Sequence, residues 1–114
     1  MKISELALAL SADILACPGL AQREVSTAYA GDMLSDVLAL GKQPDVLLTG
    51  LLNPQVIRTA EMLDTACVIF VRGKAVSESI LSLAEKCGIC VLSTRLEMYP
   101  ACTALFGAGI SAPL

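Results

Sequence analysis

The sequence predicts an α/β fold, a three-layer sandwich built around a mostly parallel sheet. Three apolar runs, residues 45–48, 67–71 and 89–92, are each long enough for a strand that is covered on both faces. The segments between these runs can each hold a helix, which a parallel crossover requires. Glycines, hydroxyls and cations follow each run, and sheets of this kind bind ligands at the carboxyl ends of their strands.

The first thirty residues add shorter elements to this core. Residues 3–10 fit a short helix with Ser4 as its cap. Residues 12–17 fit either a short strand or the end of a helix, and Pro18-Gly19 predicts a turn. Alternating residue types over 23–30 predict a strand.

Four helices are expected after this strand. Asp32 is a favourable N-cap for a helix over residues 32–40, and Asn53-Pro54 marks the start of the next. Residues 77–87 form the third. Thr94-Arg95-Leu96-Glu97 matches a capping box, which predicts a last helix that runs to about Phe106.

Length and composition fit one domain that spans residues 1–114. The chain is 55% hydrophobic, enough for a core without metals or disulfides. Its net charge is −3 and it has no cluster of basic residues, which argues against nucleic-acid binding. It has no histidine, the commonest metal ligand and general base near neutral pH. No apolar run approaches the roughly 20 residues of a membrane span, so no membrane association is expected.

The cysteines predict structural roles rather than redox or metal chemistry. Cys87-Gly88-Ile89-Cys90 has CxxC spacing, but Cys87 is expected to end a helix and Cys90 to begin a strand. A redox pair lies at the opposite end of a helix, where the dipole lowers the thiol pKa. The other three cysteines lack the paired spacing of a zinc site. We therefore expect buried thiols in a reducing cytoplasm, with no metal and no cofactor.

Known catalytic motifs are missing from the sequence. Gly73-Lys74 is followed by Ala75-Val76, which does not complete a phosphate-binding P-loop. Gly107-Ala108-Gly109 follows a helix, which is the wrong context for a dinucleotide-binding turn. No serine or cysteine has a histidine partner. These observations favour a protein that is not an enzyme.

The candidate ligand-binding residues lie where the strands of the predicted sheet end. The functional interpretation is a small anionic or nucleotide-like ligand held by Arg72, Lys74 and backbone amides near helix N-termini. The alternative interpretation is that Asn53 and Thr94 only cap their helices while the cations are solvated. The candidate set is Asp32, Ser35, Thr49, Gly50, Asn53, Arg72, Gly73, Lys74, Ser93 and Thr94.

The segment from Val25 to Val37, with Gly31-Asp32-Met33-Leu34-Ser35 at its centre, resembles the corresponding segment of DRTGG domains. The strands that end in Val71-Arg72-Gly73-Lys74 and Leu92-Ser93-Thr94 extend the resemblance over nearly the whole chain. DRTGG domains are similar to the N-terminal domain of HPr kinase/phosphorylase, and they also occur beside CBS domains. The resemblance implies a regulatory or ligand-sensing domain. Chains of this kind can carry a serine-kinase label, but this chain lacks the P-loop that such kinase chemistry requires.

Three functional hypotheses follow. The first is a non-catalytic regulatory module, homo-oligomeric and most simply dimeric, that binds a small anionic metabolite or a protein partner. The second is a small enzyme that uses Asp32 as a base with Arg72 and Lys74 as electrophiles. The third is a scaffold subunit that docks a redox enzyme such as an iron hydrogenase. This third hypothesis rests on the resemblance and on the high apolar fraction of the chain.

Overall fold

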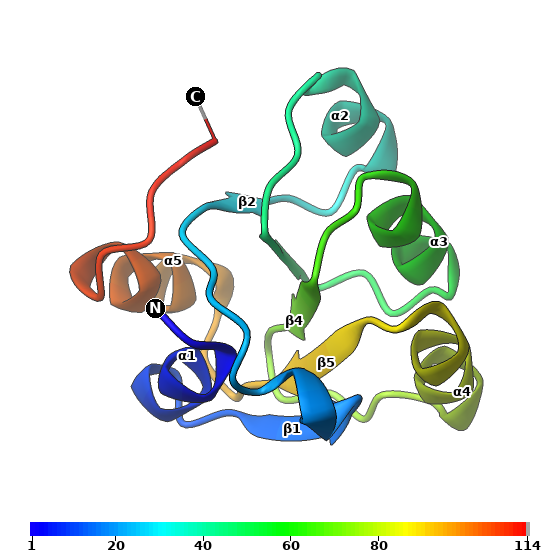
Figure 1. The fold of residues 1–114 in the computed structure, drawn as a ribbon, viewed down its shortest axis with the longest axis horizontal. Helices are drawn as coiled ribbons and strands as arrows, with labels where there is room; N and C mark the ends of the chain where they lie inside the picture. Colours follow the sequence, from blue (N-terminus) through cyan, green and yellow to red (C-terminus); the bar gives the residue numbers. More distant parts are fainter. Residues whose placement is uncertain (114) are drawn as a thin grey trace.

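The computed structural model describes residues 1–113, and it confirms the predicted fold class. Five strands form one sheet, and helices cover both of its faces (Figure 1). The elements in chain order are α1 (Ile3–Ala9), β1 (Asp13–Ala16), a 3-10 turn (Pro18–Leu20), β2 (Ala28–Ala30), α2 (Leu34–Ala39), β3 (Val46–Thr49), α3 (Gln55–Met62), β4 (Cys67–Phe70), α4 (Glu78–Cys87), β5 (Cys90–Ser93) and α5 (Met98–Gly107).

The sheet has the strand order β1-β5-β4-β3-β2. The four strands from β2 to β5 are parallel, and β1 pairs antiparallel with β5. Every residue of β3 and β4 is buried, as expected for central strands with helices on both sides. The parallel arrangement brings the carboxyl ends of β2, β3, β4 and β5 to one edge of the sheet, called here the carboxyl edge.

Two hydrophobic clusters fill the space on either side of the sheet. Helices α1 and α5 lie on one face, and α2, α3 and α4 lie on the other (Figure 1). Alternate residues of each central strand contribute to the two clusters: Val46 and Leu48 face α1 and α5, whereas Leu47 faces the opposite layer. This alternation explains the continuous apolar runs in the sequence.

Helix α4 follows its sequence signals closely. The Ser77 hydroxyl accepts a hydrogen bond from the Ile80 N–H, which caps the first turn. Gly88 ends the helix with φ of 73°, the left-handed conformation that glycine adopts most easily. Cys87 therefore closes α4 and Cys90 opens β5, as the sequence predicts.

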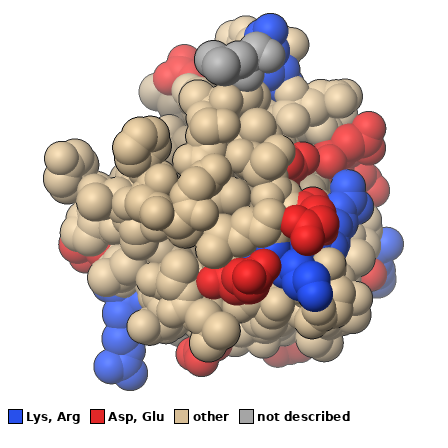
Figure 2. All heavy atoms as spheres, turned by 60° about the vertical axis from the view of Figure 1, so that its left-hand side comes forward, with Lys and Arg blue, Asp and Glu red and all other residues tan. Residues whose placement is uncertain are grey.

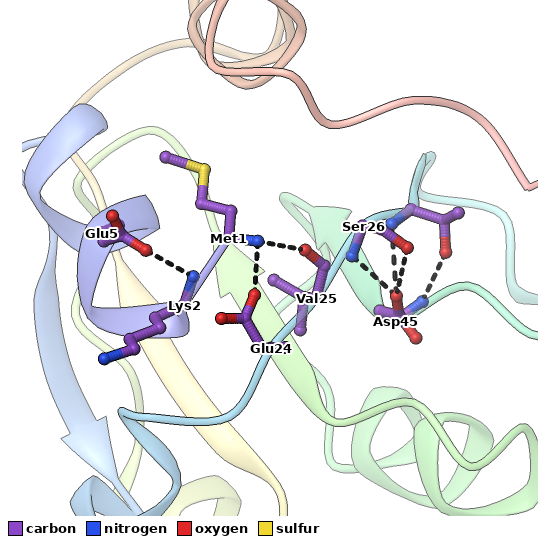
Figure 3. A network of polar contacts seen from close by, with 8 residues as sticks. Met1, Lys2, Glu5, Glu24, Val25, Ser26 and Asp45 are labelled. Carbon is purple, nitrogen blue, oxygen red and sulfur yellow. Dashed lines mark hydrogen bonds and ion pairs between the residues drawn. The ribbon is translucent and has the colours of Figure 1, made fainter.

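The strand predicted over residues 23–30 is shorter in the structure, where only Ala28–Ala30 belongs to the sheet. Other partners hold the preceding backbone, as Figure 3 shows. Glu24 forms an isolated bridge with Lys2, and the Asp45 carboxylate accepts hydrogen bonds from the N–H groups of Ser26 and Thr27. These contacts fix the segment beside α1 and β3 instead of extending β2.

Three predicted helix caps are wrong. Helix α1 begins at Ile3 with Lys2 at the cap position, so Ser4 lies inside its first turn. Helix α2 begins at Leu34, and Asp32 does not cap it because its carboxylate turns toward the loop after β3. Helix α5 begins at Met98 with Glu97 at the cap position, so Thr94 does not form the predicted capping box. Asn53 behaves nearly as expected: its side-chain oxygen accepts a hydrogen bond from the N–H of Gln55, the first residue of α3.

Within residues 1–113, no helix is long and apolar enough to cross a membrane.

Candidate functional site

The candidate site lies at the carboxyl edge, where loops leave β2, β3 and β4. Asp32 follows β2, Thr49 ends β3 with Gly50 directly after it, and Arg72 follows β4. These residues, together with Glu97 at the start of α5, are in contact through the Arg72 side chain and the Asp32 carboxylate. We call the five residues the Arg72 cluster.

Asp32 links the loops after β2 and β3. One carboxylate oxygen, Oδ1, accepts hydrogen bonds from the Gly50 N–H at 2.7 Å and from the Thr49 hydroxyl at 3.1 Å. The Gly50 N–H, then the Thr49 hydroxyl and the Arg72 guanidinium, hold the pKa of Asp32 below its ordinary value, although partial burial opposes them. A carboxylate stabilised in this way accepts a proton poorly, which does not fit the general-base role of the small-enzyme hypothesis.

Arg72 lies between two carboxylates. Its Nη1 is 3.5 Å from Asp32 Oδ2, and its Nε is 3.6 Å from Glu97 Oε1. The backbone of Arg72 has φ of 75°, a left-handed conformation that costs a non-glycine residue roughly 1–2 kcal/mol. Such conformations concentrate at functional sites, where surrounding contacts maintain them.

Gly50 leaves the space that the Arg72 side chain occupies. A Cβ at Gly50 would lie 1.7 Å from Arg72 Nη1, so any larger residue would displace the guanidinium. The side chain of Arg72 is 31% exposed, which leaves part of the guanidinium open to solvent. The cluster thus presents a positioned cation at the surface.

Two further cations flank Arg72. Gly73 also has a left-handed backbone, with φ of 65°, and a Cβ there would lie 3.3 Å from Cγ of Arg95. The Arg95 side chain therefore passes close over Gly73. Arg95 and Lys74 are both exposed, so three cationic side chains belong to this part of the carboxyl edge.

Several expected ligand contacts are already used within the protein. The Thr49 hydroxyl donates to Asp32 and accepts from the Leu51 N–H. The buried Thr94 hydroxyl donates to the Leu10 carbonyl at 2.8 Å. The N–H of Gly50 donates to Asp32, and that of Gly73 donates to the Thr94 carbonyl. An anion would therefore meet side-chain cations here, and these two threonines would act by positioning them.

The remaining candidates lie away from the Arg72 contacts. Ser35 is exposed in the first turn of α2, and Asn53 is engaged at the start of α3. Ser93 ends β5 and is the register partner of Asp13 in β1. These three residues lie after β2, after β3 and at the end of β5, and within residues 1–113 no hydrogen bond or ion pair joins any of them to Arg72.

Sequence reasoning missed Arg95 and Glu97. Both lie inside the stretch that matches a capping box, and this pattern assigns the stretch to the start of the last helix and not to a binding site. The signal that could have found them is the topology: the segment after β5 runs back along the loop after β4, and the Arg72 N–H donates to the Leu96 carbonyl at 2.8 Å.

Four of the five thiols show the raised pKa values expected of structural cysteines, whereas the contact with Cys67 lowers the pKa of Cys90. Cys67 and Cys90 are register partners on neighbouring strands, and the contact with Cys90, together with burial, raises the pKa of Cys67. Desolvation and the Glu85 carboxylate raise the pKa of Cys17 to about 11. Desolvation and Glu61 also raise the pKa of Cys87. High thiol pKa values disfavour the reactive thiolate. Among the described residues, no group of three potential metal ligands gathers.

Comparison with known proteins identifies the fold but no family. No family model and no curated protein sequence matches the chain. A similar solved structure contains the CBS and DRTGG domains of the regulatory region of a Clostridium perfringens pyrophosphatase, complexed with its activator, diadenosine tetraphosphate. The TM-score is 0.72 at 16% identity, and the match covers 91% of this chain and 45% of that one. At this identity the likeness establishes that the two share a fold, which is the one that the resemblance to DRTGG domains predicts.

Proposed function

We propose that the chain is a non-catalytic regulatory module, a single domain over residues 1–114, that binds a small phosphate-bearing or nucleotide-like metabolite at the carboxyl edge. The observation that carries the proposal is the placement of Arg72. Its backbone is left-handed, its side chain lies over a glycine, and its guanidinium remains partly exposed between two carboxylates. Left-handed backbones at non-glycine residues concentrate at functional sites, and at Arg72 this conformation coincides with an exposed cation.

The charges around Arg72 suit an anion of more than one charge. Arg72 itself is partly neutralised by Asp32 and Glu97, whereas Lys74 and Arg95 have no ion pair among the described residues. An incoming phosphate would contact these two side chains and compete with Glu97 for Arg72. Arginine suits this exchange because its guanidinium binds carboxylates and phosphates in the same geometry.

The shared fold adds support from an independent direction. The pyrophosphatase region with this fold is regulatory, and it was crystallised with a nucleotide activator. A regulatory role for this chain is therefore consistent with the regulatory region that contains the matched fold. The five free cysteines fit a reducing compartment such as the cytoplasm.

A thermal-shift screen against nucleotides, dinucleoside polyphosphates, acyl phosphates and sugar phosphates tests the proposal. We expect at least one phosphate-bearing compound to raise the melting temperature, because a ligand that binds only the folded state stabilises it. Replacing Arg72 with Ala should abolish the shift. If no compound in the screen shifts the melting temperature and the protein instead co-purifies with a redox enzyme, the scaffold hypothesis replaces this one.

The variant Glu97→Gln refines the test. Glu97 is 70% exposed and pairs with Arg72 Nε at 3.6 Å, so its removal should change stability little. We expect tighter binding of the phosphate compound, because a competing carboxylate is lost. Weaker binding would mean that Glu97 is needed to position Arg72.

A further inference from the structure

The outer side of α5 carries no charged side chain. None occurs in α5 or in residues 108–113. Tyr99, Thr103 and Phe106 recur at the spacing that places them on one side of a helix, and all three are exposed. Tyr99 is 83% exposed and Phe106 is 79% exposed. We call the surface formed by these three residues the α5 face.

Figure 2 shows the side of the molecule to which α5 belongs. The centre of this view is a broad uncharged surface, and the acidic and basic side chains lie mainly at its margins. Helix α1, which contacts α5, exposes Leu8 at 81% on the same layer of the sandwich. Exposed apolar surface of this extent on a small protein usually marks an interaction site.

An apolar pocket opens beside Phe106. It has a volume of about 220 Å³ and lies between α5, the edge strand β2 and the segment after α5. Phe106 forms part of its wall together with Ala30, Leu48 and Leu105, and no lining residue is charged. A cavity of roughly 150 Å³ is large enough to hold a benzene molecule, so this pocket has room for a phenyl ring.

We propose that a second copy of the chain covers the α5 face in a two-fold dimer, in which each copy inserts Phe106 into the pocket of the other. The same surface then supplies both the ring and the pocket, which is what a two-fold interface requires. The sequence predicts a homo-oligomer without indicating a surface, and the α5 face supplies one.

Charge favours a second copy over other occupants. A surface without charges neither repels itself nor selects a charged partner, and it can pack against an identical surface without burying an unpaired ion. A strongly basic or acidic partner would find no complementary group here.

The available area is also sufficient. A stable interface buries about 800 Å² on each partner, roughly one seventh of the 5764 Å² surface of this chain. Covering Tyr99 and Phe106 alone would bury roughly 250–400 Å². The remainder can come from uncharged neighbours on α5, α1 and the segment after α5.

Light scattering coupled to size exclusion, at protein concentrations across the micromolar range, tests the dimer. We expect the wild-type chain to have twice the mass of one chain. Phe106→Ser should yield the mass of one chain with unchanged circular dichroism, because the residue is exposed. Met62→Ser removes a side chain of similar exposure, 68%, from α3 on the opposite layer, and it should remain dimeric. A wild-type monomer at every concentration, or a dimer that survives Phe106→Ser, would overturn the proposal.

A mixing experiment tests the reciprocal insertion. Phe106→Ala removes the ring, which is also one wall of the pocket, but leaves the other lining residues in place. Ala30→Phe fills the pocket but keeps the ring. Each variant alone should be monomeric or weakly dimeric. Their mixture should form a heterodimer, because one ring can still enter one open pocket. If the mixture associates no more than the separate variants, Phe106 does not enter the pocket of a second copy.

Discussion

At the level of single residues, the Arg72 cluster depends on backbone conformations that the sequence does not display. The residue types at this edge were predictable, since polar side chains follow each apolar run. The left-handed backbone of Arg72 and the approach of its side chain to Gly50 were not, because arginine rarely adopts such a conformation. Asp32 belongs to the predicted candidate set, but its contact with the loop after β3 was not predictable, because a helix cap and a loop-to-loop contact look alike in sequence.

The variant Gly50→Ala tests the contact between Gly50 and Arg72. The added Cβ would lie 1.7 Å from Arg72 Nη1, so the guanidinium must move away from Asp32. We expect a stability loss below about 1 kcal/mol, because the ion pair is partly exposed, but a clear loss of anion affinity. A double-mutant cycle provides the control: in the Arg72→Ala background, Gly50→Ala should change neither quantity, and additive effects would contradict the account.

The pH dependence of stability tests the role of Asp32. Its pKa is lowered in the folded state, so its contribution to stability is present above the unfolded value of about 3.9 and is lost as the pH falls through the folded value. Asp32→Asn should therefore cost roughly 1 kcal/mol near neutral pH and less in acid. Urea unfolding of both proteins at pH 7 and pH 3 measures the difference. An equal difference at both values would show that the charge of Asp32 does not matter.

At the level of secondary structure, the central elements could be predicted and the edges could not. The strands β3, β4 and β5 are buried on both faces, so their apolar runs carry the signal directly. The segment before β2 has the alternating residue types that predict a strand. In the structure its backbone bonds to Asp45 and pairs with Lys2 and therefore does not extend β2. A local sequence pattern cannot predict which tertiary partner the backbone of such a segment will bond to.

Two glycines test the helix-end assignments. Gly88 and Gly107 both have open space where a Cβ would lie, but only Gly88 has a positive φ, of 73°. Gly88→Ala should therefore destabilise the protein by roughly 1–2 kcal/mol through backbone strain alone. Gly107→Ala, at the end of α5, should be neutral or slightly stabilising. If thermal unfolding shows equal stability losses for the two variants, packing around the added methyl group and not backbone conformation would determine the loss.

At the level of the whole molecule, the parallel topology brings residues that are far apart in the sequence together in one candidate site. Asp32, Gly50 and Arg72 follow three different strands, and parallel pairing brings the three loops to the same edge. Because the sequence shows the chain order of the strands and their apolar pattern, it predicts which residues gather at the carboxyl edge and so where the candidate site lies. The neighbours Arg95 and Glu97 were not, since the return of the segment after β5 is set by backbone hydrogen bonds to Arg72 and Gly73.

The most direct test of the account compares Arg72→Ala with Arg58→Ala in calorimetric titration with a phosphate compound found by the thermal-shift screen. Among residues 1–113, Arg58 forms one ion pair, with Glu61 on the exposed side of α3, so it serves as a matched control. A lost charge-assisted contact of roughly 1.5–3 kcal/mol predicts that Arg72→Ala weakens binding by roughly 10- to 150-fold, with Arg58→Ala close to wild type. Equal and negligible effects of the two substitutions would show that the Arg72 cluster only ties loops together and that the ligand binds elsewhere.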